Sequence, residues 1–331
     1  EMRILLLTQY HWPENFLINS LVPLLVARGV EVTVLTGKPN YPDGLIFEGY
    51  RAGGCHREQH DGTTILRLPI VARGHRSRTR LALNYLSFIF SGILFGRGLV
   101  GERGYDVVFV YAPSPLLQAL PAIWLARSRQ VPVVVWVQDL WPESMSATGS
   151  IKSQWLLGAV ARVVRLIYRA SDRILVQSRA FVAPVAALTD DPTKIHYYPN
   201  LYKTSSERHV SQRATALVKE LQAHFSVVFA GNLGTAQALD TIVEAARELL
   251  PHPDIRIVLV GSGSLDDWLV HQRDAYGLTN LTLTGRFEAS DMSAIFAAAE
   301  ALLVSLRPEP TFGLTIPSKL QAYLAAGRPV L

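Results

Sequence analysis

Residues 131–138 read Val-Pro-Val-Val-Val-Trp-Val-Gln, an almost wholly apolar run that predicts a buried strand. Other short apolar runs recur along the chain, and segments with helical spacing lie between them. Strands that alternate with helices in this way are typical of parallel sheets covered by helices on both faces. The sequence therefore predicts an α/β protein with doubly wound sheets. Its 331 residues, at roughly 150 per domain, favour two domains.

The first series of elements predicts an N-terminal Rossmann-like domain over residues 1–200. A helix expected at 19–28 ends before Gly29, where a left-handed residue commonly closes a helix, and a second helix is expected at 153–169. The predicted strands cover residues 3–8, 31–36, 64–68, 107–111, 131–138 and 173–176.

A second Rossmann-like domain is predicted over residues 201–331, after a polar linker at 200–206. Two open sheets in tandem bind ligands beyond the carboxyl ends of their strands, so we expect a substrate cleft between the domains. Because the chain stops at Leu331, where a buried strand should begin, we expect this domain to be incomplete. The predicted elements are strands at 226–230, 255–260, 281–284, 301–305 and 329–331, and helices at 238–249, 265–275, 290–298 and 318–325.

Composition excludes several classes of protein. With 49% apolar and 18% charged residues the chain is an ordinary globular protein, not a disordered one. Its one cysteine, Cys55, excludes a disulfide scaffold and a zinc cage and fits a reducing cytoplasm. No secretory signal is visible at the start, where residues 2–7 predict a buried strand.

Basic residues concentrate in one short segment, although the net charge is only +5. Such a cluster favours an anionic surface, a phospholipid or a nucleic acid, and the lack of aromatic RNA-binding signatures favours lipid. The cluster consists of Arg67, Arg73, Arg76, Arg78 and Arg80, with no acidic residue among them.

An uncharged run follows the arginines directly, at residues 81–96. It is shorter than the roughly 20 residues that span a bilayer. A strongly apolar helix with a basic collar can lie in the plane of a membrane surface. A helix that is apolar all round can also be a core helix of the first domain with solvated arginines, and both interpretations stay open.

Two glycine-rich turns follow predicted strands of the second domain. Gly231-Asn232-Leu233-Gly234 lets backbone N–H groups approach a phosphate, although glycines also serve tight turning alone. At Gly261 and Gly263, a tight backbone turn without phosphate contact is the favoured interpretation. The third glycine of a dinucleotide fingerprint would fall at Asp266, which argues against a nicotinamide dehydrogenase.

Ser318 and Lys319 follow Pro317, a residue that fits the first turn of a helix. A lysine at a positive helix N-terminus suits a diphosphate. The alternative is a capped helix with a solvated lysine.

Polar residues also follow two predicted strands of the first domain. Asp139 and Glu143 follow the strand at 131–138, where a carboxylate can accept a hydrogen bond from a sugar hydroxyl or act as a general base. His11 follows the first strand beside aromatic residues, as is common where sugars bind. The alternatives are an aspartate that caps a turn and a buried structural histidine.

The chain resembles glycosyltransferase family 4, whose members have two Rossmann-like domains facing a cleft, the GT-B fold. The resemblance covers nearly the whole chain and includes the branch of N-acetyl-L-fucosamine transferase-like enzymes of bacterial surface polysaccharide synthesis. It rests on motifs at residues 9–14 (Gln-Tyr-His-Trp-Pro-Glu), 36–42 (Thr-Gly-Lys-Pro-Asn-Tyr-Pro), 48–50 (Glu-Gly-Tyr), 139–144 (Asp-Leu-Trp-Pro-Glu-Ser), 231–234 (Gly-Asn-Leu-Gly), 285–286 (Gly-Arg), 317–319 (Pro-Ser-Lys) and 325–330 (Ala-Ala-Gly-Arg-Pro-Val).

The resemblance implies that a hexosyl group is transferred from a nucleotide diphosphate sugar with retention of configuration, without a metal or other cofactor. The second domain would hold the donor, and fixed cations there would stabilise the leaving diphosphate. Catalytic roles are expected for Asp139, Glu143 and His11. The donor-binding residues implied by position are Gly231, Asn232, Gly234, Gln237, Arg286, Ser318 and Lys319.

We expect a UDP-linked N-acetylated amino sugar as donor and a lipid-linked or lipopolysaccharide saccharide as acceptor, with no nucleic acid partner. The protein would lie in the cytoplasm, peripherally on the inner face of the cytoplasmic membrane. Many family members have two glutamates at the positions of Leu314 and Ala322. Their absence keeps a non-catalytic nucleotide-sugar-binding or assembly protein open, and a UDP-sugar epimerase on the same fold is a further alternative.

Overall fold

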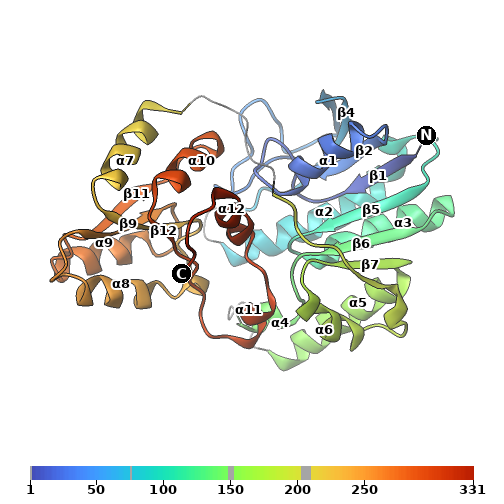
Figure 1. The fold of residues 1–331 in the computed structure, drawn as a ribbon. Helices are drawn as coiled ribbons and strands as arrows, with labels where there is room; N and C mark the ends of the chain where they lie inside the picture. Colours follow the sequence, from blue (N-terminus) through green and yellow to red (C-terminus); the bar gives the residue numbers. More distant parts are fainter. Residues whose placement is uncertain (1, 75–76, 148–152, 203–209) are drawn as a thin grey trace. The chain divides into compact units, whose positions relative to one another are not determined.

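The computed structural model describes residues 2–74, 77–147, 153–202 and 210–331, and the chain divides into two compact units, Glu1–Leu201 and Tyr202–Leu331 (Figure 1). Arg76 and residues 203–206 of the expected linker lie outside the described residues. Each unit is built on a largely parallel sheet with helices on both faces. The predicted α/β class with two doubly wound domains is confirmed.

Unit 1 contains an eight-stranded sheet in the order β3-β4-β2-β1-β5-β6-β7-β8, parallel except for the pair β3/β4. The strands are β1 (Arg3–Leu7), β2 (Glu31–Gly37), β3 (His56–His60), β4 (Thr63–Leu68), β5 (Val107–Ala112), β6 (Val133–Val137), β7 (Arg173–Val176) and β8 (Ile195–Tyr197). The helices are α1 (Ile18–Val26), α2 (Arg78–Val100), α3 (Ala119–Arg129), α4 (Glu143–Ala147), α5 (Gln154–Ala170) and α6 (Val182–Ala186).

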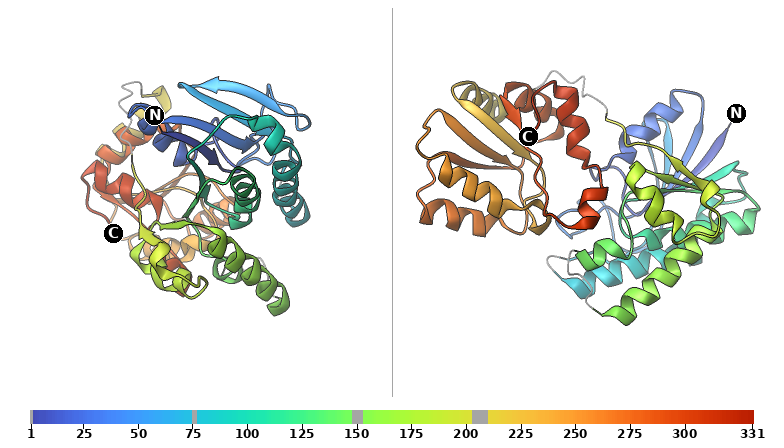
Figure 2. Two further views of the ribbon diagram at one scale, coloured as in Figure 1. Left: turned by 90° about the vertical axis from the view of Figure 1, so that its right-hand side faces the viewer. Right: turned by 60° about the horizontal axis from the view of Figure 1, so that its bottom comes forward.

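Alternating side chains of the strands reach opposite faces of this sheet. Val34 of β2 packs in one core with Ile18 and Val22 of α1. Its neighbour Leu35 faces α2 on the other side, where a Cβ added at Gly96 would lie 3.5 Å from it. Helix α3 packs between α2 and α5, which Figure 2 shows from two further directions.

Buried polar side chains of α2 form hydrogen bonds with the segments that follow β1 and β4. The Asn84 side chain, fully buried, donates to the Val71 carbonyl at 2.7 Å and accepts from Gln9 Nε2 at 2.7 Å. Ser91 Oγ donates to the Pro69 carbonyl at 2.6 Å. These bonds fix which face of the helix points inward.

The strand predictions fail at two edges of this sheet. β3 is exposed and polar, and β8 is only three residues long, so neither produces an apolar run. β3 pairs antiparallel with β4 as an edge hairpin. Its stability comes from backbone pairing, which a pattern of side chains does not reveal.

Unit 2 contains a four-stranded parallel sheet in the order β11-β10-β9-β12. In Figure 1, α7 and α10 lie above this sheet and α8 and α9 below it. The predicted strand 301–305 shortens to two residues, and 329–331 contributes a single bridge between Val330 and Leu302. The elements are α7 (Gln212–Gln222), β9 (Phe225–Ala230), α8 (Leu239–Glu248), β10 (Ile255–Val260), α9 (Asp266–Ala275), β11 (Leu281–Gly285), α10 (Ala289–Ala298), β12 (Ala301–Leu302), α11 (Pro310–Leu314) and α12 (Ser318–Ala326).

Candidate functional site

The carboxyl ends of β9, β10 and β11 are joined by backbone hydrogen bonds that glycine N–H groups donate. Gly231 N–H donates to the Val260 carbonyl, and Gly261 N–H donates to the Gly285 carbonyl, each at 2.9 Å. A Cβ at position 261 would lie 1.9 Å from the Gly231 carbonyl oxygen. Close packing of two turns therefore requires glycine at 261, in agreement with the interpretation of that turn as structural.

Lys319, the second residue of α12, places its ammonium beside the first of these turns. Its Nζ lies 3.6 Å from the centre of the Phe229 ring, and a Cβ at Gly231 would lie 3.0 Å from it. This nitrogen is buried, and no described group accepts a hydrogen bond from it. Burial lowers the pKa of Lys319 to about 8. A buried cation without a hydrogen-bond acceptor is costly, and an anionic ligand would supply one.

The N-terminus of α12 adds a second feature that attracts anions. The helix begins after Pro317, and no side chain caps its first turn. Uncapped N–H groups and the helix dipole favour a negative charge at this end. Ser318 is exposed there. The solvated lysine of the alternative interpretation is excluded, because the Lys319 ammonium is buried.

The other residues expected at the donor site lie at the same edge of the sheet. Gly234 N–H donates to Gln237 Oε1 at 3.3 Å, so the Gln237 amide holds the turn. A Cβ at Gly234 would lie 2.6 Å from Asn232 Nδ2, so glycine makes room for that side chain. Arg286 follows β11 and is exposed.

In unit 1, Asp139 lies two residues after β6. Its Oδ2 accepts hydrogen bonds from Ser144 Oγ at 3.1 Å and Trp141 Nε1 at 3.3 Å. Burial raises the pKa of Asp139 to about 6 despite these bonds. A carboxylate with such a pKa can accept a proton near neutral pH. Glu143 begins α4 and is exposed, and its charge contributes to the raised pKa of Asp139.

His11 occupies a different environment from Asp139. It is 3% exposed, and neither ring nitrogen has a hydrogen-bond partner among the described residues. Burial, with smaller effects of Arg67 and His60, lowers the pKa of His11 to about 3, so the ring is neutral. Asp139 is not among the groups that act on it. This environment corresponds to the buried structural histidine that the sequence left open.

Sequence reasoning missed a group of residues around Asp139. The hydroxyl of Tyr85, from α2, shares side-chain hydrogen bonds with Tyr10 and Ser114, and the charges of Arg73 and Asp139 act on it. Tyr85 lies within the apolar run 81–96, and its hydroxyl, a polar group in that run, could have indicated a functional residue.

Glu14 was missed as well. Its buried carboxylate accepts from Asn40 N–H at 2.8 Å and Tyr41 N–H at 2.7 Å. These bonds join the loop after β1 to the loop after β2. Burial raises the pKa of Glu14 to about 7.

Two of the four arginines expected at a membrane surface have described side chains, Arg73 and Arg80. Arg73 donates to the Tyr10 hydroxyl at 3.3 Å, and its guanidinium carbon lies 5.0 Å from the Tyr41 ring centre. Arg73 therefore contacts the polar edge of unit 1 itself. Arg80 is exposed on the first turn of α2. Arg76 lies outside the described residues, as does the Arg78 side chain.

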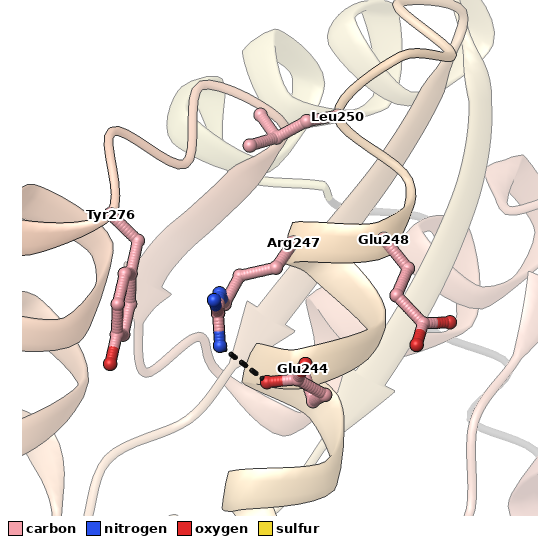
Figure 3. A pocket seen from close by; sticks show the side chains of 5 residues that line it. All are labelled: Glu244, Arg247, Glu248, Leu250 and Tyr276. Carbon is pink, nitrogen blue, oxygen red and sulfur yellow. Dashed lines mark hydrogen bonds and ion pairs between the residues drawn. The ribbon is translucent and has the colours of Figure 1, made fainter.

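A pocket of about 420 Å³ lies elsewhere in unit 2, lined by α8 and Tyr276 (Figure 3). Arg247 pairs with Glu244 at 2.8 Å and lies over the Tyr276 ring at 4.3 Å. The C-terminal parts of α8 and α9 form it. In a parallel α/β sheet these helix ends lie at the edge opposite the carboxyl ends of the strands, so the pocket is distinct from the site around Lys319.

Comparisons with known families match both units. Residues 17–201 match the model of the glycosyl transferase 4-like domain. Residues 224–331 match the model of glycosyl transferases group 1.

A relative in Escherichia coli, the putative colanic acid biosynthesis glycosyl transferase WcaI, is 25% identical over 318 residues, which cover 93% of this chain and 76% of the relative. Among solved structures, sucrose-phosphate synthase from Thermosynechococcus elongatus superposes with a TM-score of 0.73 at 16% identity, covering 100% of this chain and 80% of that one. Anabaena HepE in complex with UDP and glucose gives a TM-score of 0.65 at 16% identity with the same coverage. These structural likenesses identify the GT-B fold.

Proposed function

The chain belongs to the glycosyl transferase 4-like family and is a glycosyltransferase, and from this premise we propose the substrates and the course of its reaction. We propose that it transfers an N-acetylated amino sugar from a UDP-sugar to a lipid-linked saccharide, with retention of configuration and without a metal ion. The donor binds to unit 2 and the acceptor to unit 1. The amino sugar rests on the resemblance to the fucosamine transferase-like branch.

The observation that carries the proposal is the buried ammonium of Lys319, to which no described group offers a hydrogen-bond acceptor. It stands at the uncapped N-terminus of α12, beside a glycine that leaves space for it. A nucleotide diphosphate supplies the anion that this cation lacks. As the sugar leaves, the diphosphate gains negative charge, and a fixed cation with helix N–H groups stabilises that charge without a metal. The complex of HepE with UDP supports uridine as the nucleoside.

Asp139 is the group that we propose at the reacting centre. Because its pKa is about 6, it is mostly ionised at neutral pH and can accept a hydrogen bond from the acceptor hydroxyl. The bonds from Ser144 and Trp141 hold the carboxylate in one orientation. Glu143 and His11 have no comparable support.

The lipid-linked acceptor is proposed from the outer face of α2. Among the described residues, α2 is the one helix long and apolar enough to cross a membrane. Its inner face is hydrogen-bonded to the segment after β4 through Asn84 and Ser91, so we propose that it lies along the bilayer. Its outer face carries an exposed apolar stripe with an exposed arginine at each end, in the order Arg80, Leu83, Leu86, Phe90, Leu94 and Arg97.

This arrangement suits an anionic bilayer, because apolar side chains enter the interface while the arginines meet headgroups. We propose the inner face of the cytoplasmic membrane as the location, where nucleotide sugars and lipid-linked saccharides meet. A role in surface polysaccharide synthesis is supported by the name of the relative WcaI.

The test is transfer of labelled sugar from a panel of UDP-N-acetylhexosamines to membrane lipids of a polysaccharide-producing bacterium. We expect release of UDP together with label in the lipid phase, and loss of both in a Lys319→Met variant. Binding of UDP without release of UDP from any donor would instead favour the non-catalytic nucleotide-sugar-binding protein.

A further inference from the structure

A polar cluster that includes Asp139 lies at the carboxyl edge of the unit 1 sheet. Tyr10 follows β1, Ser114 follows β5 and Asp139 follows β6, while Arg73 comes from the segment after β4. Parallel strands bring their carboxyl ends to one edge, so residues far apart in sequence meet here. Tyr85 of α2 shares side-chain hydrogen bonds with Tyr10 and Ser114, and the charges of Arg73 and Asp139 act on its hydroxyl.

Arg73 lacks the partner that a half-buried arginine usually has. In the described part of the chain no carboxylate lies within ion-pair distance of it, and its side chain makes one hydrogen bond, to the Tyr10 hydroxyl. A guanidinium carries five N–H donors in a planar fork. Most of these donors therefore remain available to a ligand at this edge.

The neighbours of Arg73 limit what that ligand can be. Tyrosine hydroxyls and the Asp139 carboxylate are hydrogen-bonding groups that suit sugar hydroxyls. The guanidinium fork matches the two oxygens of a carboxylate or phosphate. Burial raises the pKa of Tyr85, and the charges of Arg73 and Asp139 act on the same hydroxyl with opposite effects.

We propose that Arg73 binds an anionic group attached to the acceptor sugar, a phosphate or a carboxylate, while the Tyr85 hydroxyl contacts a sugar hydroxyl. This inference rests on the proposed function and specifies its acceptor. A lipid-linked sugar carries a phosphate at its reducing end, and a uronic acid carries a carboxylate. Fixing the anion on Arg73 holds the acceptor in one orientation relative to Asp139.

The test measures binding of glucose 1-phosphate, glucuronic acid and glucose to the full chain by ligand-observed NMR. All proteins carry Lys319→Met, which keeps phosphate away from the proposed donor site. We expect glucose 1-phosphate or glucuronic acid to bind. Arg73→Gln should weaken that binding about tenfold or more, as for loss of a charged hydrogen bond. Arg51→Gln, which changes an exposed arginine of the same unit, is the matched control and should bind as the parent does.

Stronger binding of glucose 1-phosphate supports a phosphate-linked acceptor, and stronger binding of glucuronic acid supports a uronic acid. The proposal is overturned if neither charged probe binds, if glucose binds equally well, or if Arg73→Gln binds as the parent does. Titration of UDP into Arg73→Gln with Lys319 intact checks that this variant is folded. Failure of the native chain to bind UDP would count against the proposed donor site, whereas the Arg73 comparison would remain interpretable.

Discussion

Replacing Lys319 with methionine removes a buried charge and keeps most of the apolar stem. Burial lowers the pKa of this lysine from 10.5 to about 8 in the ligand-free protein. At about 1.4 kcal/mol for each pKa unit, the folded state disfavours the ammonium by about 3 kcal/mol at neutral pH. We therefore expect the variant without ligand to be more stable than the native chain, by up to about 3 kcal/mol in urea unfolding.

The same substitution should weaken UDP binding by about 1.5–3 kcal/mol, which is roughly 10–150-fold in Kd. Isothermal titration at pH 7 without metal measures it. Because Lys319 loses its proton as the pH rises through about 8, the native affinity should fall above that pH and the affinity of the variant should not. The matched control is Lys219→Met, at an exposed lysine of α7 in the same unit.

Two results would refute this reasoning. An unchanged Kd for UDP in Lys319→Met would remove the lysine from the site. A ligand-free variant less stable than the native chain would show that the ammonium is satisfied in the folded protein, and the argument that it needs an anionic ligand would fail.

Asp139→Asn should lower turnover about 100-fold with little change in UDP affinity. The rate of the native protein should fall as the pH drops through about 6, because Asp139 is then protonated. Equal losses of rate and UDP affinity in the variant would indicate a structural role. Gly261→Ala should destabilise unit 2 by about 2 kcal/mol or more in thermal unfolding, because the Cβ of the alanine would lie 1.9 Å from the Gly231 carbonyl oxygen. Unchanged stability would show that the two turns can separate. Replacing Phe90 and Leu94 together by serine should weaken binding to anionic vesicles about tenfold or more in a sedimentation assay, because both side chains are well exposed on α2. Undiminished binding would exclude this face of α2 from the membrane contact.

The sheets were predictable because their central strands are buried on both faces and read as apolar runs. The strand predicted at 107–111, for example, forms as β5 (Val107–Ala112). The polar edge strand β3 and the two-residue β12 were not predictable, because backbone pairing and not side-chain burial defines them.

Local sequence patterns predicted where the residues of the candidate site lie along the chain, but not their surroundings in the fold. The positions of Lys319 and Asp139 at strand and helix ends follow from the sequence, but their burial and their pKa values come from contacts between distant elements. Arg73 belongs to a basic cluster in the sequence, and its hydrogen bond to the Tyr10 hydroxyl is visible only in the folded structure. His11 stands at the expected strand end, but its burial cannot be seen in one motif.

The central claim is that unit 2 binds the diphosphate of a nucleotide sugar at Lys319 and the N-terminus of α12. The most direct measurement is calorimetric titration of the chain with UDP and with uridine, in the presence of a metal chelator. The account predicts micromolar binding of UDP and far weaker binding of uridine, because uridine lacks the anion that Lys319 needs. Equal affinities for the two, or no binding of UDP, would contradict it.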